Sequence, residues 1–123
     1  LLTKKIIQFR DERDWKQFHK PKDMALSLSL ETAEVLEHFQ WKNEEEVGEY
    51  VKTHKRELGD ELADVLFWVI AMSHDLNIDI VKAINEKMVK NAKKYPIEKS
   101  KGKHTKYTML QWSLFGVIHI DPE

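Results

Sequence analysis

Residues 26–39 have the sequence LSLSLETAEVLEHF, and this stretch decides how the chain is predicted to fold. On an α-helix its apolar residues, from Leu26 to Phe39, cover more than half of the circumference. A helix with so wide an apolar surface packs against neighbours on two sides. We therefore predict a buried helix over residues 22–39, entered through Pro21, which the first turn of a helix tolerates.

Helical spacing of apolar residues continues on both sides of this stretch, and the chain has only four glycines and three prolines. The spacing predicts further helices at about 3–19 and 55–74, and one from a cap at Asn77 or Asp79 to about Tyr95, because Pro96 cannot continue it. Residues 44–54 are predicted to form a short polar helix or a loop. The expected fold class is all-α, a four-helix-bundle type that buries its wide apolar helix faces by oligomerising.

Candidate core positions follow the same spacing in the first and last of these helices. They are Ile6, Ile7, Phe9 and Phe18 in the first, and Ile80, Ile84, Met88 and Ala92 in the last. Residues 1–108 are predicted to form one domain. Residues 109–123 are aromatic, prone to β-structure and poor in charge, so we expect a C-terminal tail that is either docked on the domain, an edge strand or a segment foreign to the domain.

The composition of the 123 residues excludes several classes of protein. Without cysteine, disulfides and thiolate metal sites are excluded. No apolar run approaches the roughly 20 residues of a membrane span, and the amphipathic N-terminal segment does not resemble a signal peptide. A net charge of −1 argues against a general nucleic-acid binder. We expect a cytoplasmic protein that binds neither membranes nor nucleic acid.

Two carboxylate pairs stand three residues apart on two of the predicted helices: Glu31 with Glu34, and Glu61 with Asp64. Because each residue of a helix advances by about 100°, each pair lies on one face. If the apolar stripes beside them pack together, the four carboxylates converge, and a divalent cation would relieve their repulsion. Magnesium prefers such oxygen ligands and bridges them to phosphates. Glu-x-x-Glu pairs also occur on solvated helix faces, so the spacing alone leaves both interpretations open.

Other sites fit the sequence less well. A di-iron bundle needs Glu-x-x-His motifs, and no histidine of this chain stands three residues after a glutamate. A Gly-rich phosphate loop is also missing from the sequence, so phosphate would be bound by metal and lysines. Nine lysines lie between Lys82 and Lys106, against two glutamates, although a solvated lysine-rich helix has the same composition.

Four stretches in one order resemble a known family. They are RDWKQFH at 13–19, ETAE at 31–34 followed by HFQW at 38–41, DELADV at 60–65, and KMVKNAKKYP at 87–96. Together they are similar to the dCTP pyrophosphatase branch of the MazG-like, all-α nucleotide pyrophosphohydrolases. The similarity runs from about Ile6 to Pro96 without large gaps.

The resemblance implies hydrolysis of a (deoxy)nucleoside triphosphate, with dCTP or a related pyrimidine nucleotide expected, to the monophosphate and pyrophosphate. It implies a role in clearing unwanted nucleotides, a magnesium cofactor with manganese as the alternative ion, and a homo-oligomer, either a dimer or a dimer of dimers. Carried over by position, the metal ligands and catalytic residues are Glu31, Glu34, Glu61 and Asp64. The expected substrate contacts are Trp15 and Trp41, stacked on the base, His38 and Trp68 lining the site, and Lys87, Asn91 and Lys94 at the phosphates.

Two departures from the family pattern concern specificity and packing. Leu30 and Ala33 replace glycines that usually flank the first carboxylate pair. Ile6 stands where this branch often has a histidine, which leaves the base preference open. His19 is expected at a helix end or on the surface. The alternative functions are a non-catalytic helical interaction module and a dUTP or phosphoribosyl-ATP hydrolase on the same fold.

Overall fold

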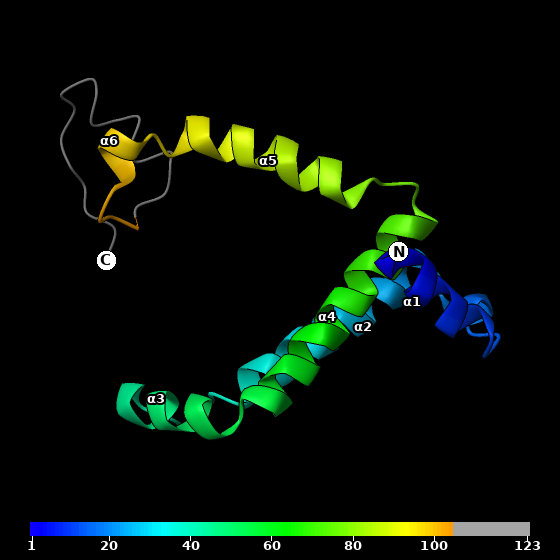
Figure 1. Cartoon of the computed structure of the whole chain (residues 1–123), viewed down its shortest axis with the longest axis horizontal. Helices are drawn as coiled ribbons and strands as arrows, with labels where there is room; N and C mark the ends of the chain where they lie inside the picture. Colours follow the sequence, from blue (N-terminus) through cyan, green and yellow to red (C-terminus); the bar gives the residue numbers. More distant parts are fainter. Residues whose placement is uncertain (105–123) are drawn as a thin grey trace. The chain divides into compact units, whose positions relative to one another are not determined.

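The computed structural model describes residues 1–104, which contain six α-helices, one 3-10 helix and no strand (Figure 1). The elements are α1 (Leu2–Asp11), η1 (Lys16–Phe18), α2 (Pro21–Glu37), α3 (Glu44–Thr53), α4 (Lys55–Asp75), α5 (Ile80–Lys94) and α6 (Ile97–Ser100). The chain divides into an N-terminal unit, Leu1–Asp79, and a C-terminal unit, Ile80–Glu123. The predicted all-α class is confirmed.

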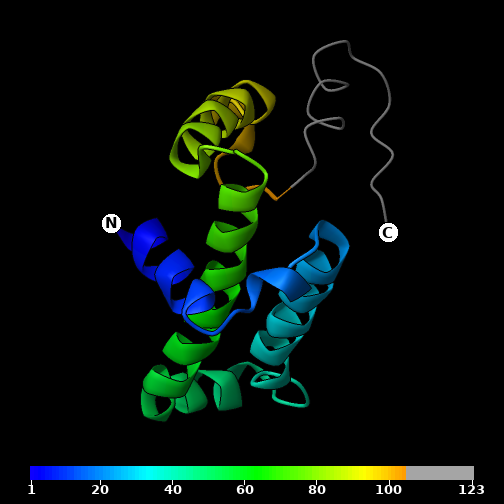
Figure 2. The ribbon, with the colours of Figure 1, turned by 90° about the vertical axis from the view of Figure 1, so that its right-hand side faces the viewer.

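In the N-terminal unit α4 is the central helix. It packs along α2 over most of its length and also contacts α1 and α3. Figure 2 shows α4 upright, with α1 on one side of it and α2 on the other. Pro21 opens α2, as expected. Of residues 44–54, left open between helix and loop, all but His54 form α3, and the Asn43 side chain caps this helix by accepting a 2.9 Å hydrogen bond from the Glu46 amide.

The predicted first helix is wrong beyond Asp11, where α1 ends. Asp14 adopts a φ of 53°, in the left-handed region, which a short polar residue tolerates better than most. The amides of Arg13 and Trp15 both turn back to the carbonyl of Arg10, each at 3.2 Å. The turn thus redirects the chain, and the segment after it approaches α2 and α4 instead of continuing away from them.

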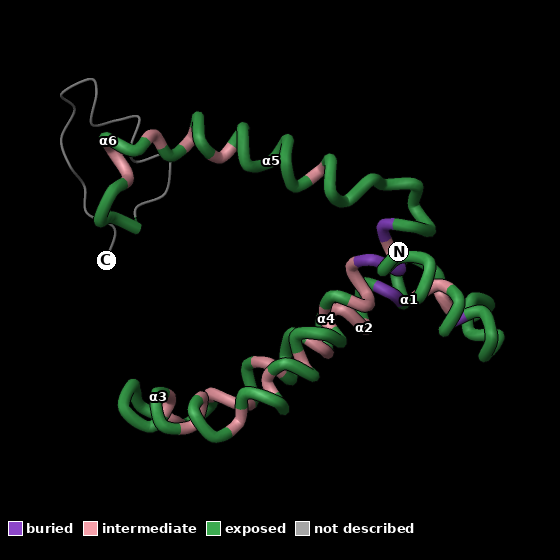
Figure 3. The backbone as a smooth tube through the Cα atoms, in the orientation of Figure 1, coloured by how far each residue is buried: buried purple, intermediate pink, exposed green. Residues whose placement is uncertain are grey.

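The fully buried core of the N-terminal unit is small. Among apolar side chains only Met24, Ile70 and Ala71 are buried within the described residues. Figure 3 shows the buried positions gathered at one end of the unit, where α1 meets α4. Arg10 is buried there as well, and its guanidinium lies 2.7 Å from a carboxylate oxygen of Asp75. This ion pair links α1 to the C-terminal end of α4.

Most of the wide apolar surface that the sequence predicts stays exposed on the single chain. The exposed leucines of α2 and α4 are Leu26, Leu30, Leu36, Leu62 and Leu66. Two positions predicted for the core of the first helix, Phe9 and Phe18, are 43% and 64% exposed, while Ile6 and Ile7 are half-buried. The predicted burial of these side chains is therefore not seen within the single chain.

The C-terminal unit begins with α5, which ends at Lys94, close to the predicted position. Pro96 then precedes the single turn of α6, which the sequence did not suggest. The predicted stripe of Ile80, Ile84 and Met88 is exposed on α5. The predicted domain end at 108 and the tail 109–123 lie outside the described residues. Within residues 1–104 no helix combines the length and the apolar character needed to cross a membrane.

Candidate active site

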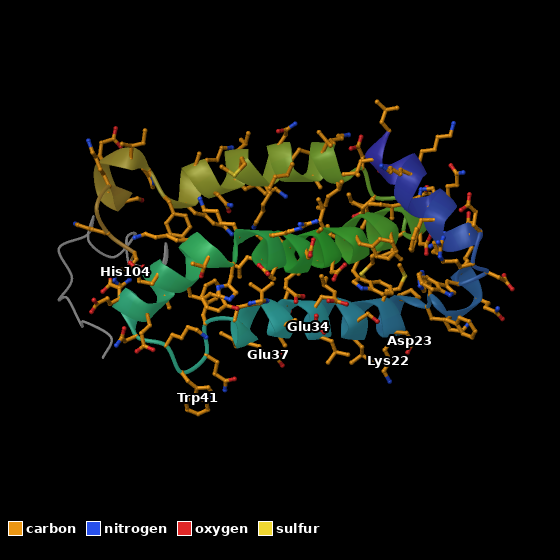
Figure 4. The ribbon with its side chains drawn as sticks, turned by 60° about the horizontal axis from the view of Figure 1, so that its bottom comes forward. Lys22, Asp23, Glu34, Glu37, Trp41 and His104 are labelled. Atoms are coloured by element: carbon orange, nitrogen blue, oxygen red, sulfur yellow. The ribbon has the colours of Figure 1, made fainter. Side chains whose placement is uncertain are left out.

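Four carboxylates from two helices meet in the N-terminal unit. Ligand atoms of Glu31 and Glu34 on α2, and of Glu61 and Asp64 on α4, all lie within 4.8 Å of one another. They converge because α2 packs along α4, and because the two members of each pair stand about one turn apart on the same helix face. Figure 4 shows Glu34 on the side of α2 that faces α4. We refer to these four residues as the carboxylate cluster.

Two oxygens of the carboxylate cluster are buried without a hydrogen-bond partner among the described residues. They are Oε2 of Glu31 and Oε2 of Glu61. The other two members, Glu34 and Asp64, are exposed, so the cluster opens to solvent. A buried carboxylate oxygen without a partner is costly, and four oxygen donors at this spacing suit a hard divalent cation. The residues present therefore fit a metal ion.

The crowding of charge changes the acid–base behaviour of Glu34. A hydrogen bond with Glu61, followed by the negative charges of Glu31 and Glu61, raises the pKa of Glu34 from 4.5 to about 7. Without a cation, the cluster keeps a proton near neutral pH. A bound cation would take the place of that proton.

Removing the Glu34 charge is expected to stabilise the metal-free protein. Because folding raises this pKa from 4.5 to about 7, the proton's contribution to stability is full below pH 4.5 and is lost as the pH rises through 7. In EDTA at pH 8, Glu34→Gln should therefore unfold at a higher temperature than the wild type, with a difference that shrinks toward pH 4.5. Thermal scans across this pH range measure the effect.

Glu37→Gln serves as the control, since Glu37 is exposed one turn later on α2 and lies outside the cluster. A lower melting temperature for Glu34→Gln at pH 8 in EDTA would contradict the repulsion inferred for the cluster.

A cavity of about 320 Å³ lies along the same helix pair. Its lining residues are Trp15, Phe18, His19, Asp23, Met24, Ser27 and Trp68, and we call it the aromatic pocket. Ser27 stands one helical turn before Glu31, and Trp68 stands one turn after Asp64. The aromatic pocket is therefore next to the carboxylate cluster, and its volume falls in the range of small-molecule sites.

Ring contacts fix the walls of the aromatic pocket. The Trp15 ring meets Phe9 edge-on at 5.7 Å between centroids, and Trp68 meets Phe67 in the same way at 5.3 Å. His19 packs on Trp68 with its centroid 4.9 Å away. These ring contacts hold the Trp15 and Trp68 side chains in place beside the cavity.

The pocket also has a polar wall, which the sequence analysis missed. Within the described part of the chain, Nδ1 of His19 is buried without a hydrogen-bond partner, and burial, aided by the charge of Arg10, lowers the pKa of His19. A neutral His19 can hydrogen-bond a ligand, and Asp23 and Ser27 line the same cavity. The expected helix-end position of His19 is confirmed, because His19 caps the C-terminal end of η1, but its side chain is half-buried and not on the surface. Its place in the RDWKQFH stretch was the one available signal for the pocket.

The other predicted substrate contacts are not among the residues that line the aromatic pocket. His38 lies beside the carboxylate cluster, with Nε2 3.4 Å from Oε1 of Glu61. Trp41 follows α2 with a φ of 68°, is 90% exposed and points away from the helices in Figure 4. The phosphate contacts Lys87, Asn91 and Lys94 share one face of α5 in the C-terminal unit and stay predictions.

Comparison with known proteins decides the family. Residues 26–110 match the MazG-like family. The chain belongs to the MazG-like family. The resemblance seen in the four sequence stretches is thereby confirmed.

Several characterised proteins are similar to this MazG-like chain. The dCTP pyrophosphatase 1 of Rattus norvegicus is 39% identical over 105 residues, which are 84% of this chain and 62% of that protein. The corresponding protein of Homo sapiens is 36% identical with the same coverage. The chain thus spans less than two thirds of the length of these relatives. A pyrophosphatase structure from Archaeoglobus fulgidus is 40% identical, with a TM-score of 0.73, and the match covers 77% of this chain and 89% of that one.

Proposed function

We propose that this MazG-like chain hydrolyses a nucleoside triphosphate, with dCTP or a related pyrimidine deoxynucleotide as the expected substrate, to the monophosphate and pyrophosphate. The observation that supports this best is the carboxylate cluster, within 4.8 Å, next to an aromatic pocket of about 320 Å³. The names of the relatives, dCTP pyrophosphatase 1 and a pyrophosphatase, support the same reaction. The biological role would be the removal of unwanted nucleotides.

Magnesium is the proposed cofactor, with manganese as the alternative. Glu31, Glu34, Glu61 and Asp64 would hold it, because all four offer the hard oxygen donors that these ions prefer. When bound, the ion would neutralise negative charge on the polyphosphate and in the transition state.

The chain's own residues supply orientation and proton transfer. The cluster is next to the aromatic pocket, so a triphosphate whose base enters the pocket would extend toward the carboxylates. Water attacks the α-phosphorus, a bond forms between its oxygen and that phosphorus, and the bond to the α–β bridging oxygen breaks. A carboxylate oxygen of the cluster accepts the proton of the water, and pyrophosphate leaves. Lys87, Asn91 and Lys94 are the proposed phosphate contacts.

Recognition of the base is assigned to the aromatic pocket. Stacking on Trp15 or Trp68 tolerates any base, so specificity must come from polar groups, and His19, Asp23 and Ser27 line the same cavity. Trp41 stays a predicted second stacking ring. Its side chain is exposed on one chain, so it would need another surface or the substrate to cover it.

Truncation of Trp15 is expected to weaken substrate binding more than chemistry. Base–aromatic stacking is worth roughly 1–3 kcal/mol, so Trp15→Ala should raise KM by about five-fold to about 150-fold with kcat changed only a few-fold. Steady-state kinetics at saturating magnesium measure both constants, and circular dichroism confirms the fold. Trp41→Ala, measured in parallel, tests the second ring. An unchanged KM in Trp15→Ala would contradict the assignment of the pocket.

A nucleotide panel tests the proposed reaction. The protein is incubated with each common dNTP, with dUTP and with phosphoribosyl-ATP, in magnesium or EDTA, and pyrophosphate and phosphate are assayed separately. We expect pyrophosphate in amounts equal to the monophosphate, only with magnesium, and fastest with dCTP or a related pyrimidine. Release from none of them would favour the non-catalytic interaction module, and a preference for dUTP or phosphoribosyl-ATP would favour the alternative hydrolases.

A homo-oligomer, either a dimer or a dimer of dimers, belongs to the same proposal. Leu26, Leu30, Leu62 and Leu66 are between 47% and 67% exposed on the single chain, and a second copy would cover them. A cytoplasmic location is also proposed, because a chain without cysteine suits a reducing compartment.

A charge placed on this leucine surface is expected to break the assembly. Leu30→Glu should reduce the mass measured by light scattering from a multiple of the 14.6 kDa chain toward a single chain. Leu2→Glu makes the same change at an exposed leucine of α1 and should leave the mass unaltered. A wild-type protein that elutes as a single chain would contradict the oligomer outright.

A further inference from the structure

His38 connects the carboxylate cluster to α3. It follows the last residue of α2, and its two ring nitrogens have different partners. Nε2 lies 3.4 Å from Oε1 of Glu61, and Nδ1 lies 2.5 Å from the hydroxyl of Tyr50. The imidazole therefore bridges a proposed metal ligand on α4 and a tyrosine on α3.

Simple donor and acceptor rules fix the direction of these hydrogen bonds. An ionised carboxylate only accepts, so Nε2 of His38 donates to Glu61. In the neutral ring Nδ1 then accepts, and the Tyr50 hydroxyl donates to it. The imidazole thus occupies Oε1 of Glu61, while Oε2 of Glu61 is buried without a hydrogen-bond partner among residues 1–104.

Tyr50 is itself held in place from several directions. Its ring stacks on His54 at 3.8 Å and 5°, and Phe39 meets it edge-on at 6.4 Å. The ammonium group of Lys42 lies 4.4 Å from the centroid of the Tyr50 ring. A phenol packed in this way presents its hydroxyl at a fixed position, so the orientation of the His38 ring is fixed as well.

We propose that Tyr50 and His38 form a positioning relay that orients Glu61 for cation binding. The inference rests on the proposed function and gives His38 a task different from the predicted substrate contact. With Oε1 held by His38, the carboxylate plane of Glu61 is set, and its other oxygen, Oε2, would stay available to a bound cation. The relay acts by hydrogen bonding alone, as outer partners of metal ligands commonly do.

The experiment compares four variants with the wild type. His38→Leu removes both hydrogen bonds at similar volume, His38→Gln keeps a nitrogen donor, and Tyr50→Phe removes a single hydroxyl. His74→Leu makes the same histidine-to-leucine change at an exposed position of α4. The measured quantities are the Mg²⁺ dissociation constant by calorimetry, KM for dCTP at saturating Mg²⁺, and the melting temperature in EDTA.

We expect His38→Leu to raise the Mg²⁺ dissociation constant by about 10- to 100-fold, the usual effect of losing an outer partner of a metal ligand. Tyr50→Phe should raise it by a smaller factor, His38→Gln should recover part of the loss, and His74→Leu should match the wild type. KM for dCTP at saturating Mg²⁺ should stay unchanged in all four. Tyr50→Phe, which deletes only one oxygen, keeps the test open if His38→Leu does not fold.

Two results would overturn the relay: wild-type Mg²⁺ affinity in His38→Leu and Tyr50→Phe, or a raised KM at saturating Mg²⁺ with unchanged Mg²⁺ affinity. A wild-type protein that neither binds Mg²⁺ nor hydrolyses dCTP would instead overturn the proposed function. The two failures are therefore distinguishable.

Discussion

Glu61→Gln is expected to lower turnover of the nucleoside triphosphate by at least about 100-fold while leaving the helical fold intact. Glu61 is half-buried in the carboxylate cluster, and one of its oxygens has no partner among the described residues. Glutamine has the same shape, but it lacks the charge that a cation requires. Loss of an outer partner of a metal ligand already costs about 10- to 100-fold, so loss of a ligand should cost at least the upper value.

Turnover with saturating magnesium, magnesium affinity by calorimetry and helical circular dichroism are the measurements for Glu61→Gln. Glu45→Gln, at an exposed position in the first turn of α3, is the matched control and should retain activity. Wild-type turnover in Glu61→Gln would show that Glu61 is not a metal ligand. The proposed ligand set would then lose one of its two half-buried members, Glu31 and Glu61.

Arg10→Met is expected to lower the free energy of unfolding by about 3–5 kcal/mol. Arg10 is 1% exposed and its guanidinium lies 2.7 Å from Asp75, so removing it leaves a carboxylate that is 17% exposed at the side chain without its partner. Urea unfolding at one fixed protein concentration measures the change, since an oligomer's stability depends on concentration.

The controls for Arg10 separate the ion pair from the loss of packing. Lys5→Met, on the exposed side of α1, should change stability by less than about 0.5 kcal/mol. The double variant Arg10→Met with Asp75→Asn should be less destabilised than the sum of the two single changes, because the second change removes the unpaired charge. Additive effects would show that the two side chains do not interact.

The bounds of the long helices were predictable from local patterns. Periodic apolar residues and Pro21 placed α2 within two residues of its observed ends, and Pro96 set the end of α5. The convergence of the carboxylates followed from their three-residue spacing, once the stripes beside them packed together. The helix bounds and the spacing within each carboxylate pair depend on neighbours in sequence, whereas the meeting of the two pairs depends on the packing of α2 on α4.

The features that were missed depend on contacts distant in sequence. After α1, the left-handed backbone of Asp14 turns the chain, and His19 then packs on Trp68. The spacing of apolar residues does not predict such a turn. The hydrogen bond between His38 and Glu61 joins positions 23 residues apart in sequence. The second partner of His38, the Tyr50 hydroxyl, is within reach only because of where α3 lies. The apolar residues of α2 and α4 follow the predicted helical spacing, but most of their leucines are exposed on the single chain, so the predicted burial is not seen within it. Apolar spacing alone does not say which surface covers them.

Hydrolysis in ¹⁸O-labelled water tests the central claim most directly, because the position of the label identifies the phosphorus that the water attacks. With dCTP and magnesium, attack at the α-phosphorus places the ¹⁸O atom in the nucleoside monophosphate and leaves the pyrophosphate unlabelled. We predict this distribution, and we predict that chelation of the metal abolishes it. Label in pyrophosphate or in inorganic phosphate would contradict attack at the α-phosphorus and the arrangement of triphosphate over the carboxylate cluster.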